Sequence, residues 1–207
     1  MIKEIRKRMM VWDSPIFFTH WLLAFCFLGA ILTQDSEKFR LVHVTMGYTM
    51  LGIVGFRVIW GFIGSKYARF TTIKPRFLRV RENIQAIFRG EKELSIGLNA
   101  LGFLAAYLLM GLVLLVSASG YLIFNEIGPE LISEAHELAG NLLIAVVVVH
   151  VGAIVLNAMY QRLQKTNAEV AKSVGVLVQR ARPYKWVTII ILLVVVYFWG
   201  IQLKIWL

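Results

Sequence analysis

The sequence has little charge and almost no cysteine, and each scarcity excludes a class of protein. Only 16% of the residues are charged and 58% are hydrophobic, a composition outside the usual range of water-soluble domains. The single cysteine, Cys26, excludes an intrachain disulfide, so cysteine usage does not indicate a redox compartment. No motif repeats with the period of a solenoid. We therefore expect an integral membrane protein.

Long apolar runs are what the sequence does contain. Five of them, near residues 16–33, 41–63, 98–124, 133–160 and 186–207, are close to the ~20 residues that a helix needs to cross a membrane. They lack the alternating polarity of a membrane barrel. The predicted fold class is all-α, an integral membrane bundle with a four-helix core in residues 1–160, a basic cytoplasmic linker in 161–185 and a fifth transmembrane helix in 186–207.

The basic residues predict how the chain crosses the membrane. Lys and Arg are concentrated before the first run, between residues 66 and 92, and between 162 and 185, whereas the first of the alternate loops has only Lys38 and Arg40 and residues 125–133 have none. The positive-inside rule then places the N-terminus in the cytoplasm and the C-terminus outside. The net charge of +10 is thus explained by orientation, and no nucleic-acid partner is expected. The first run has no small-residue cleavage site, so we expect it to be retained.

The chain has only four histidines, and their predicted depths form two levels. His136 and His150 bound the stretch "HELAGNLLIAVVVVH"; 14 residues are close to four helical turns, so both rings leave one face, ~21 Å apart. His20 lies early in the first span, near the inner surface, and His43 lies early in the second span, near the outer surface. Depth therefore pairs His43 with His136 outside and His20 with His150 inside.

Two imidazoles at each level favour a planar cofactor over a bare metal ion. One ion cannot gather all four rings, because ~2 Å coordination bonds cannot cover that separation. Zinc would want further ligands, and the available carboxylates are Glu134 and Glu137 outside and Asp13 inside. Haem b supplies four of its six iron bonds itself and needs two histidines. Two haem b groups, each held by one histidine pair, therefore fit these residues, and the alternative is that the histidines ligate nothing.

Three further residues are placed beside these histidines by their spacing. Gly47 and Gly140 each follow a histidine by one turn, in H-x-x-x-G, where a glycine would leave room for the porphyrin face; close helix packing is the alternative reading. Arg57 follows His43 by 14 residues, so it lies on the same face near the inner surface. It is a candidate partner of a propionate of the inner haem, with headgroup contact as the alternative.

These residues resemble the bacterial cytochrome b561 and nickel-iron hydrogenase b-type cytochrome superfamily, which is related to the membrane subunit of formate dehydrogenase. The resemblance covers roughly residues 11–160 and is carried by "VWDSPIFFTHW", "LVHVTMGYTMLGIVGFRVIWGFIGSKYARF", "GLNALG" and "HELAGNLLIAVVVVH". It implies that the four histidines hold two b haems in the bacterial inner membrane. It also implies electron transfer between the quinone pool, ubiquinone or menaquinone, and a periplasmic partner such as a c-type cytochrome.

Several alternatives remain open at this point. A hydrogenase or dehydrogenase subunit is less favoured, because such subunits often carry a further histidine and this chain has no fifth one. A superoxide:quinone oxidoreductase would prefer a positive outer surface, whereas the outer loop is acidic, with Glu126, Glu130, Glu134 and Glu137. Outside this class are a transporter with histidine relays and a membrane anchor that recruits a partner. The fifth span is expected to pack against a partner or to complete a homo-oligomer.

Overall fold

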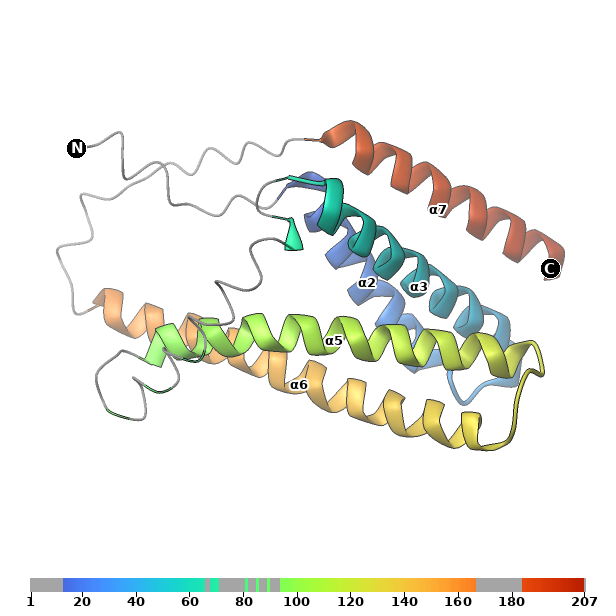
Figure 1. Ribbon diagram of the computed structural model, residues 1–207, viewed down its shortest axis with the longest axis horizontal. Helices are drawn as coiled ribbons and strands as arrows, with labels where there is room; N and C mark the ends of the chain where they lie inside the picture. The colour runs from blue at the N-terminus through green and yellow to red at the C-terminus, as the bar shows by residue number, and fades with distance from the viewer. Residues whose placement is uncertain are drawn as a thin grey trace. The chain divides into compact units, whose positions relative to one another are not determined.

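The chain folds into helices that are long enough to cross a membrane. The computed structural model describes residues 13–65, 68–70, 81, 85, 89, 94–166 and 184–206. Within these ranges there is no strand, and five helices have the length and apolarity of membrane spans (Figure 1). They are α2 (Ser14–Thr33), α3 (Arg40–Ile63), α5 (Leu94–Phe124), α6 (Leu131–Thr166) and α7 (Lys185–Trp206), with a 3-10 turn η2 (Glu37–Phe39). The predicted all-helical membrane fold is confirmed.

Some sequence predictions concern residues outside these ranges. The basic residues before the first span, most of the basic loop after residue 66 and residues 167–183 of the linker all lie outside the described residues. The predicted orientation of the termini and the division at residues 160 and 185 therefore remain predictions.

The described residues form two compact units. The first unit contains α2, α3, α7 and residues Gly120–Ile127, which are the end of α5 and the residues just after it. The second unit contains α5 up to Ser119 and α6 from its beginning. His20, His43 and Arg57 thus belong to the first unit, and His136 and His150 belong to the second.

Helix α2 begins at a well-capped N-terminus. The Asp13 carboxylate accepts a hydrogen bond of 3.0 Å from the Ile16 backbone N–H, which is the usual interaction of an N-cap aspartate. Pro15 lies in the first turn, where its missing N–H costs nothing. The other Asp13 oxygen accepts a 3.0 Å bond from Trp60 Nε1 in α3. Asp13 is 1% exposed, so both carboxylate oxygens are satisfied by the protein.

Helices α2 and α3 form an antiparallel hairpin whose register is fixed at both ends. At the turn end, Ala30 lies three residues before α2 ends and His43 lies three residues after α3 begins. Their depths therefore match, and His43 Nδ1 lies 2.8 Å from the Ala30 carbonyl oxygen. At the other end, Trp60 contacts Asp13. The same register thus holds over almost the full length of the hairpin.

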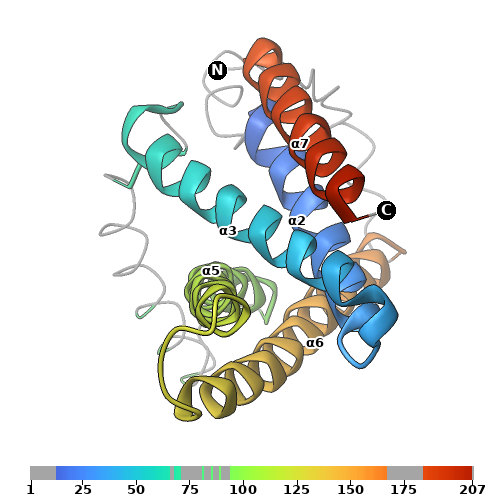
Figure 2. The same cartoon turned by 90° about the vertical axis from the view of Figure 1, so that its right-hand side faces the viewer.

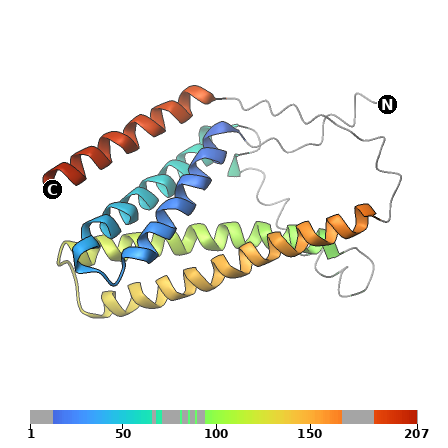
Figure 3. The ribbon, with the colours of Figure 1, turned by 180° about the vertical axis from the view of Figure 1, so that it is seen from behind.

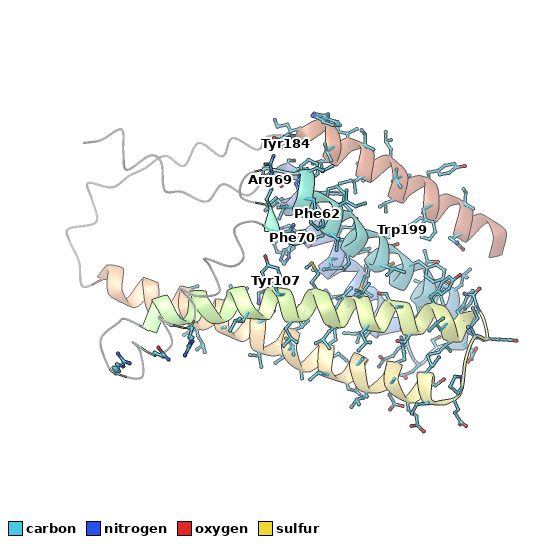
Figure 4. The ribbon with its side chains drawn as sticks, in the orientation of Figure 1. Phe62, Arg69, Phe70, Tyr107, Tyr184 and Trp199 are labelled. Carbon is cyan, nitrogen blue, oxygen red and sulfur yellow. The ribbon has the colours of Figure 1, made fainter. Side chains whose placement is uncertain are left out.

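Helix α7 packs along this hairpin (Figure 2). Near its start, Thr188 donates a 2.9 Å hydrogen bond to Ser14. Near its end, Trp199 extends toward α3 (Figure 4) and donates a 2.8 Å bond to Thr49. An apolar cluster lies between α7 and the hairpin; its buried members are Trp60, Ala68 and Val187. The fifth span therefore docks on its own chain, and the expected partner or homo-oligomer contact remains a prediction for its exposed face.

Helices α5 and α6 are joined by a short turn (Figure 3). Gly128 in this turn has φ of +102°, a backbone conformation that favours glycine. An added Cβ there would also meet the Ile132 side chain. Because α6 runs without a break from Leu131 to Thr166, His136 and His150 lie on one continuous helix, ~21 Å apart along its axis.

Candidate functional site

His43 is oriented by the hairpin that contains it. Its ring is half-buried, and Nδ1 lies 2.8 Å from the Ala30 carbonyl oxygen of α2. A carbonyl oxygen can only accept, so Nδ1 carries the hydrogen and donates it. In a neutral imidazole this places the lone pair on Nε2. Metal-binding histidines characteristically have their second nitrogen fixed in this way.

His136 has the same arrangement in the second unit. Its Nδ1 lies 3.0 Å from the Val116 carbonyl oxygen of α5 and 3.0 Å from the Ser119 hydroxyl oxygen. The Ser119 hydroxyl in turn donates to the Leu115 carbonyl at 2.8 Å. One Nδ1–H is therefore shared between two acceptors, which again places the lone pair of the ring on Nε2.

His150 differs from the other histidine of α6. Its ring is half-buried, yet its Nδ1 is buried and has no hydrogen-bond partner within the described part of the chain. His20 on α2 is exposed, and its ring meets the Trp21 ring edge-on at 5.8 Å between centroids. The structure thus orients His43 and His136 through carbonyl groups and leaves His150 without such an acceptor.

Gly47 and Gly140 lie in open surroundings. No heavy atom outside the helix's own backbone lies within 4 Å of a Cβ built on either residue. Gly29 behaves differently, since its Cβ would touch the Met46 side chain at 3.3 Å. Openness is shared by other glycines, including Gly52, so what singles out Gly47 and Gly140 is their position one turn after a histidine. At both positions an added Cβ would meet no other side chain.

Arg57 is engaged close to the end of α3. Its Nη1 donates a 3.1 Å hydrogen bond to the Ala68 carbonyl oxygen, and its guanidinium lies over the Phe70 ring, 5.6 Å from the centroid. Arg57 therefore fastens the chain that follows α3 back onto that helix. The spacing argument in the sequence did not anticipate this contact.

The donor set of the described residues fits haem. No group of three His, Cys, Asp or Glu side chains suited to a metal ion is found among the described residues, and Asp13 is already bonded to α2 and α3. His43 and His136 each present an Nε2 lone pair, beside a glycine with open space. Imidazole nitrogens of this kind are groups that would ligate the iron of a haem, which supplies its other bonds itself.

Sequence reasoning missed the three groups that orient the rings. The carbonyls of Ala30 and Val116 have no side-chain signature, so no pattern identifies them. Ser119 did leave a signal: it lies five residues before α5 ends, and His136 lies five residues after α6 begins. Residues equally far from a tight helical turn lie at equal depth, so the two side chains meet.

Comparison with known proteins identifies a family. The family model described as prokaryotic cytochrome b561 matches residues 11–167. This range contains all four histidines and helices α2, α3, α5 and α6, and it ends before α7 begins. The search of curated proteins and the search of solved structures each gave no match.

Proposed function

The chain belongs to the prokaryotic cytochrome b561 family, and from this premise we propose that it is a di-haem electron carrier between the quinone pool and a periplasmic redox protein. Membership makes it a membrane-embedded, multi-pass b-type cytochrome that transfers electrons. The number of haems, the ligand pairing, the inner-membrane location and both redox partners are the proposal. The observation that carries it is the pair of Nδ1 contacts that place the lone pairs of His43 and His136 on Nε2.

The spacing of the histidines within each unit excludes two of the possible ligand pairs. His43 is level with Ala30, which lies ten residues after His20 on α2, so the two histidines differ in depth by ~15 Å. His136 and His150 differ by ~21 Å. Bonds of ~2 Å to one iron would bring two ligand nitrogens within ~4 Å of each other. His20 with His43, and His136 with His150, are therefore too far apart to share an iron, which leaves the proposed pairs, His43 with His136 and His20 with His150, compatible with these spacings.

The lean of helical side chains brings these two spacings closer. Side chains tilt toward the N-terminus of their helix and cover a point about one residue, ~1.5 Å, nearer to it. The contact of the His43 ring with Ala30 already gives the level of that ring, so only the lean of His20 toward the start of α2 is added, and the separation grows to ~17 Å. His136 and His150 lie on one helix and lean in the same direction, so their separation stays ~21 Å. The two separations are therefore closer to each other than the residue spacings alone suggest.

Contacts in the first unit support the pairing of His43 with His136. The Arg40 guanidinium at the start of α3 lies over the Phe124 ring at the end of α5, 5.9 Å from its centroid. Asn125 Nδ2 also donates a 3.4 Å bond to Tyr48 Oη. The α5–α6 turn therefore begins at the same end as the α2–α3 turn. Along the chain, His43 lies close to the α2–α3 turn and His136 lies close to the α5–α6 turn, whereas His20 and His150 lie farther from these turns along α2 and α6.

In this proposal the protein holds the cofactors and sets their depth. When bound, each haem would carry one electron between its ferric and ferrous forms. His43 and His136 would hold the outer haem, with Gly47 and Gly140 leaving room for its faces. His20 and His150 would hold the inner haem. Two levels separated along the membrane normal suit electron transfer from one side to the other.

Arg57 is proposed to pair with a propionate of the inner haem. It lies 14 residues after His43 on α3, toward the end at which Asp13 contacts Trp60. A guanidinium has five N–H donors, so the bond to the Ala68 carbonyl is compatible with an ion pair to a carboxylate. Contact with lipid headgroups remains the competing role for Arg57.

The proposed partner on the outer side is a basic redox protein such as a c-type cytochrome. Four carboxylates in and after the α5–α6 turn are all exposed: Glu126, Glu130, Glu134 and Glu137. Exposed charges of one sign steer an oppositely charged partner and raise its association rate. Neutral or negative partners, the superoxide anion included, gain nothing from these side chains.

Haem content and spectrum test the proposal. The purified full-length protein should show sharp b-type bands in a reduced-minus-oxidised spectrum and about two haems per chain by pyridine haemochromogen assay. A histidine-relay transporter would show neither. One haem per chain, or none in a folded preparation, would refute the di-haem carrier.

A further inference from the structure

Ser119 provides an acceptor for a proposed haem ligand on α6. Its hydroxyl oxygen lies 3.0 Å from His136 Nδ1, and its own hydrogen is directed to carbonyl oxygens of α5, Leu115 at 2.8 Å and Val116 at 3.0 Å. Because both of these acceptors belong to α5, the hydroxyl hydrogen points to α5. The oxygen lone pairs therefore face the imidazole. Ser119 is 8% exposed, so water has little access to take the place of its hydroxyl as the hydrogen-bond acceptor.

The other histidine of the same helix has no equivalent acceptor. His150 Nδ1 is buried and unpaired within the described residues. In the register that brings Ser119 to His136, the residue of α5 that corresponds to His150 is Ala105, 14 residues earlier. Its methyl side chain accepts no hydrogen bond. The two ligands of α6 therefore differ in the acceptor that α5 offers them.

This difference has an electronic consequence. An imidazole that donates its Nδ1–H to an acceptor becomes more basic, so its Nε2 is a stronger donor to the iron. A stronger axial donor stabilises the ferric form more than the ferrous form. Hydrogen bonding around the ligands is one of the means by which a protein sets a haem potential.

We propose that Ser119 is a positioning residue that lowers the midpoint potential of the outer haem through His136. This inference rests on the proposed function, since it requires His136 to be an axial ligand. Ser119 does not touch the haem and acts only on the second nitrogen of the ring. The Val116 carbonyl shares the same Nδ1–H at 3.0 Å, so removal of Ser119 weakens the donation without abolishing it.

Ser119→Ala in the full-length, haem-loaded protein tests the inference. A mediated redox titration follows each haem, and the outer haem is the one lost in His136→Ala. At a fixed ambient potential the ratio of reduced to oxidised outer haem should rise roughly two- to tenfold, the range for one hydrogen bond. The inner haem should not shift. Ser119→Thr retains the hydroxyl and should restore the wild-type midpoint.

Ser117 provides a matched control on the same helix. Its hydroxyl is buried but has no hydrogen-bond partner among the described residues, so Ser117→Ala removes a buried hydroxyl without touching His136. Both midpoints should stay unchanged in that variant. Ser119→Cys keeps the volume of the side chain but accepts a hydrogen bond only weakly. It should shift the midpoint potential of the outer haem in the same direction as Ser119→Ala, and it replaces the alanine variant if that variant loses haem.

The outcomes separate this inference from the proposed function. A wild-type protein without two b haems would refute the function itself. Two haems whose midpoints are the same in wild type, Ser119→Ala and Ser119→Cys would refute only the role of Ser119. An equal shift in Ser117→Ala would also refute it, because the effect would then follow from any lost hydroxyl.

Discussion

His43 Nδ1 donates a 2.8 Å hydrogen bond to the carbonyl oxygen of Ala30. His43, a proposed iron ligand, therefore also links α3 to α2. The bond closes the turn end of a hairpin whose other end is closed by Asp13 and Trp60. Ligand orientation and hairpin register therefore depend on each other.

Trp60→Phe should destabilise the hairpin at its other end. The substitution removes the indole N–H and leaves one oxygen of the buried Asp13 carboxylate without its donor. An unsatisfied buried acceptor costs about 1–3 kcal/mol, so the thermal unfolding midpoint in detergent should fall. Trp186→Phe is the control, because Trp186 is 63% exposed on α7. Equal thermal unfolding midpoints of Trp60→Phe and Trp186→Phe would show that the Asp13–Trp60 hydrogen bond contributes nothing to stability.

Trp199→Phe should weaken the docking of α7 without loss of haem. The variant loses the 2.8 Å bond to Thr49 but keeps a ring to stack on Phe25, whose centroid lies 6.1 Å away. Hydrogen bonds between membrane helices average about 0.6 kcal/mol, so a small decrease in melting temperature is expected. Haem content should stay the same, since no proposed ligand lies on α7. Tyr197→Phe, at a position 72% exposed, is the control.

Gly47→Leu should abolish binding of the outer haem. A Cβ at Gly47 meets nothing within 4 Å in the protein, and in the proposed arrangement the leucine would enter the space taken by the porphyrin. Gly52→Leu is the matched control, because Gly52 lies on the same helix, is exposed and is equally open. The measurement is haem per chain with the low-spin EPR signals of each haem. Retention of both haems in Gly47→Leu would refute a role for that glycine in haem binding.

The sequence predicted the helices well for a physical reason. A membrane span requires a long continuous apolar run, and that requirement leaves little freedom in length or position, so α2, α3, α5, α6 and α7 lie within a few residues of the predicted runs. The 14-residue spacing of His136 and His150 likewise requires only regular helix geometry. Both features are local along the chain.

The parts that the sequence did not predict involve distant residues or backbone groups. Trp199 and Thr49 are 150 residues apart, and no sequence pattern at either residue indicates that the two are hydrogen-bonded. Arg57 was expected to meet a propionate or headgroups, but the spacing alone could not reveal its bond to the Ala68 carbonyl, because carbonyl acceptors are the same at every position. The contact of Ser119 with His136 could have been predicted from the sequence, because both residues lie five positions from the α5–α6 turn.

The central claim is the proposed pairing of the ligands, with His43 and His136 on one iron and His20 and His150 on the other. Its most direct test is low-spin EPR of the four single His→Ala variants at matched protein concentration. We expect His43→Ala and His136→Ala to lose the same signal, and His20→Ala and His150→Ala to lose the other. Loss of one and the same signal in His20→Ala and His136→Ala would contradict the pairing.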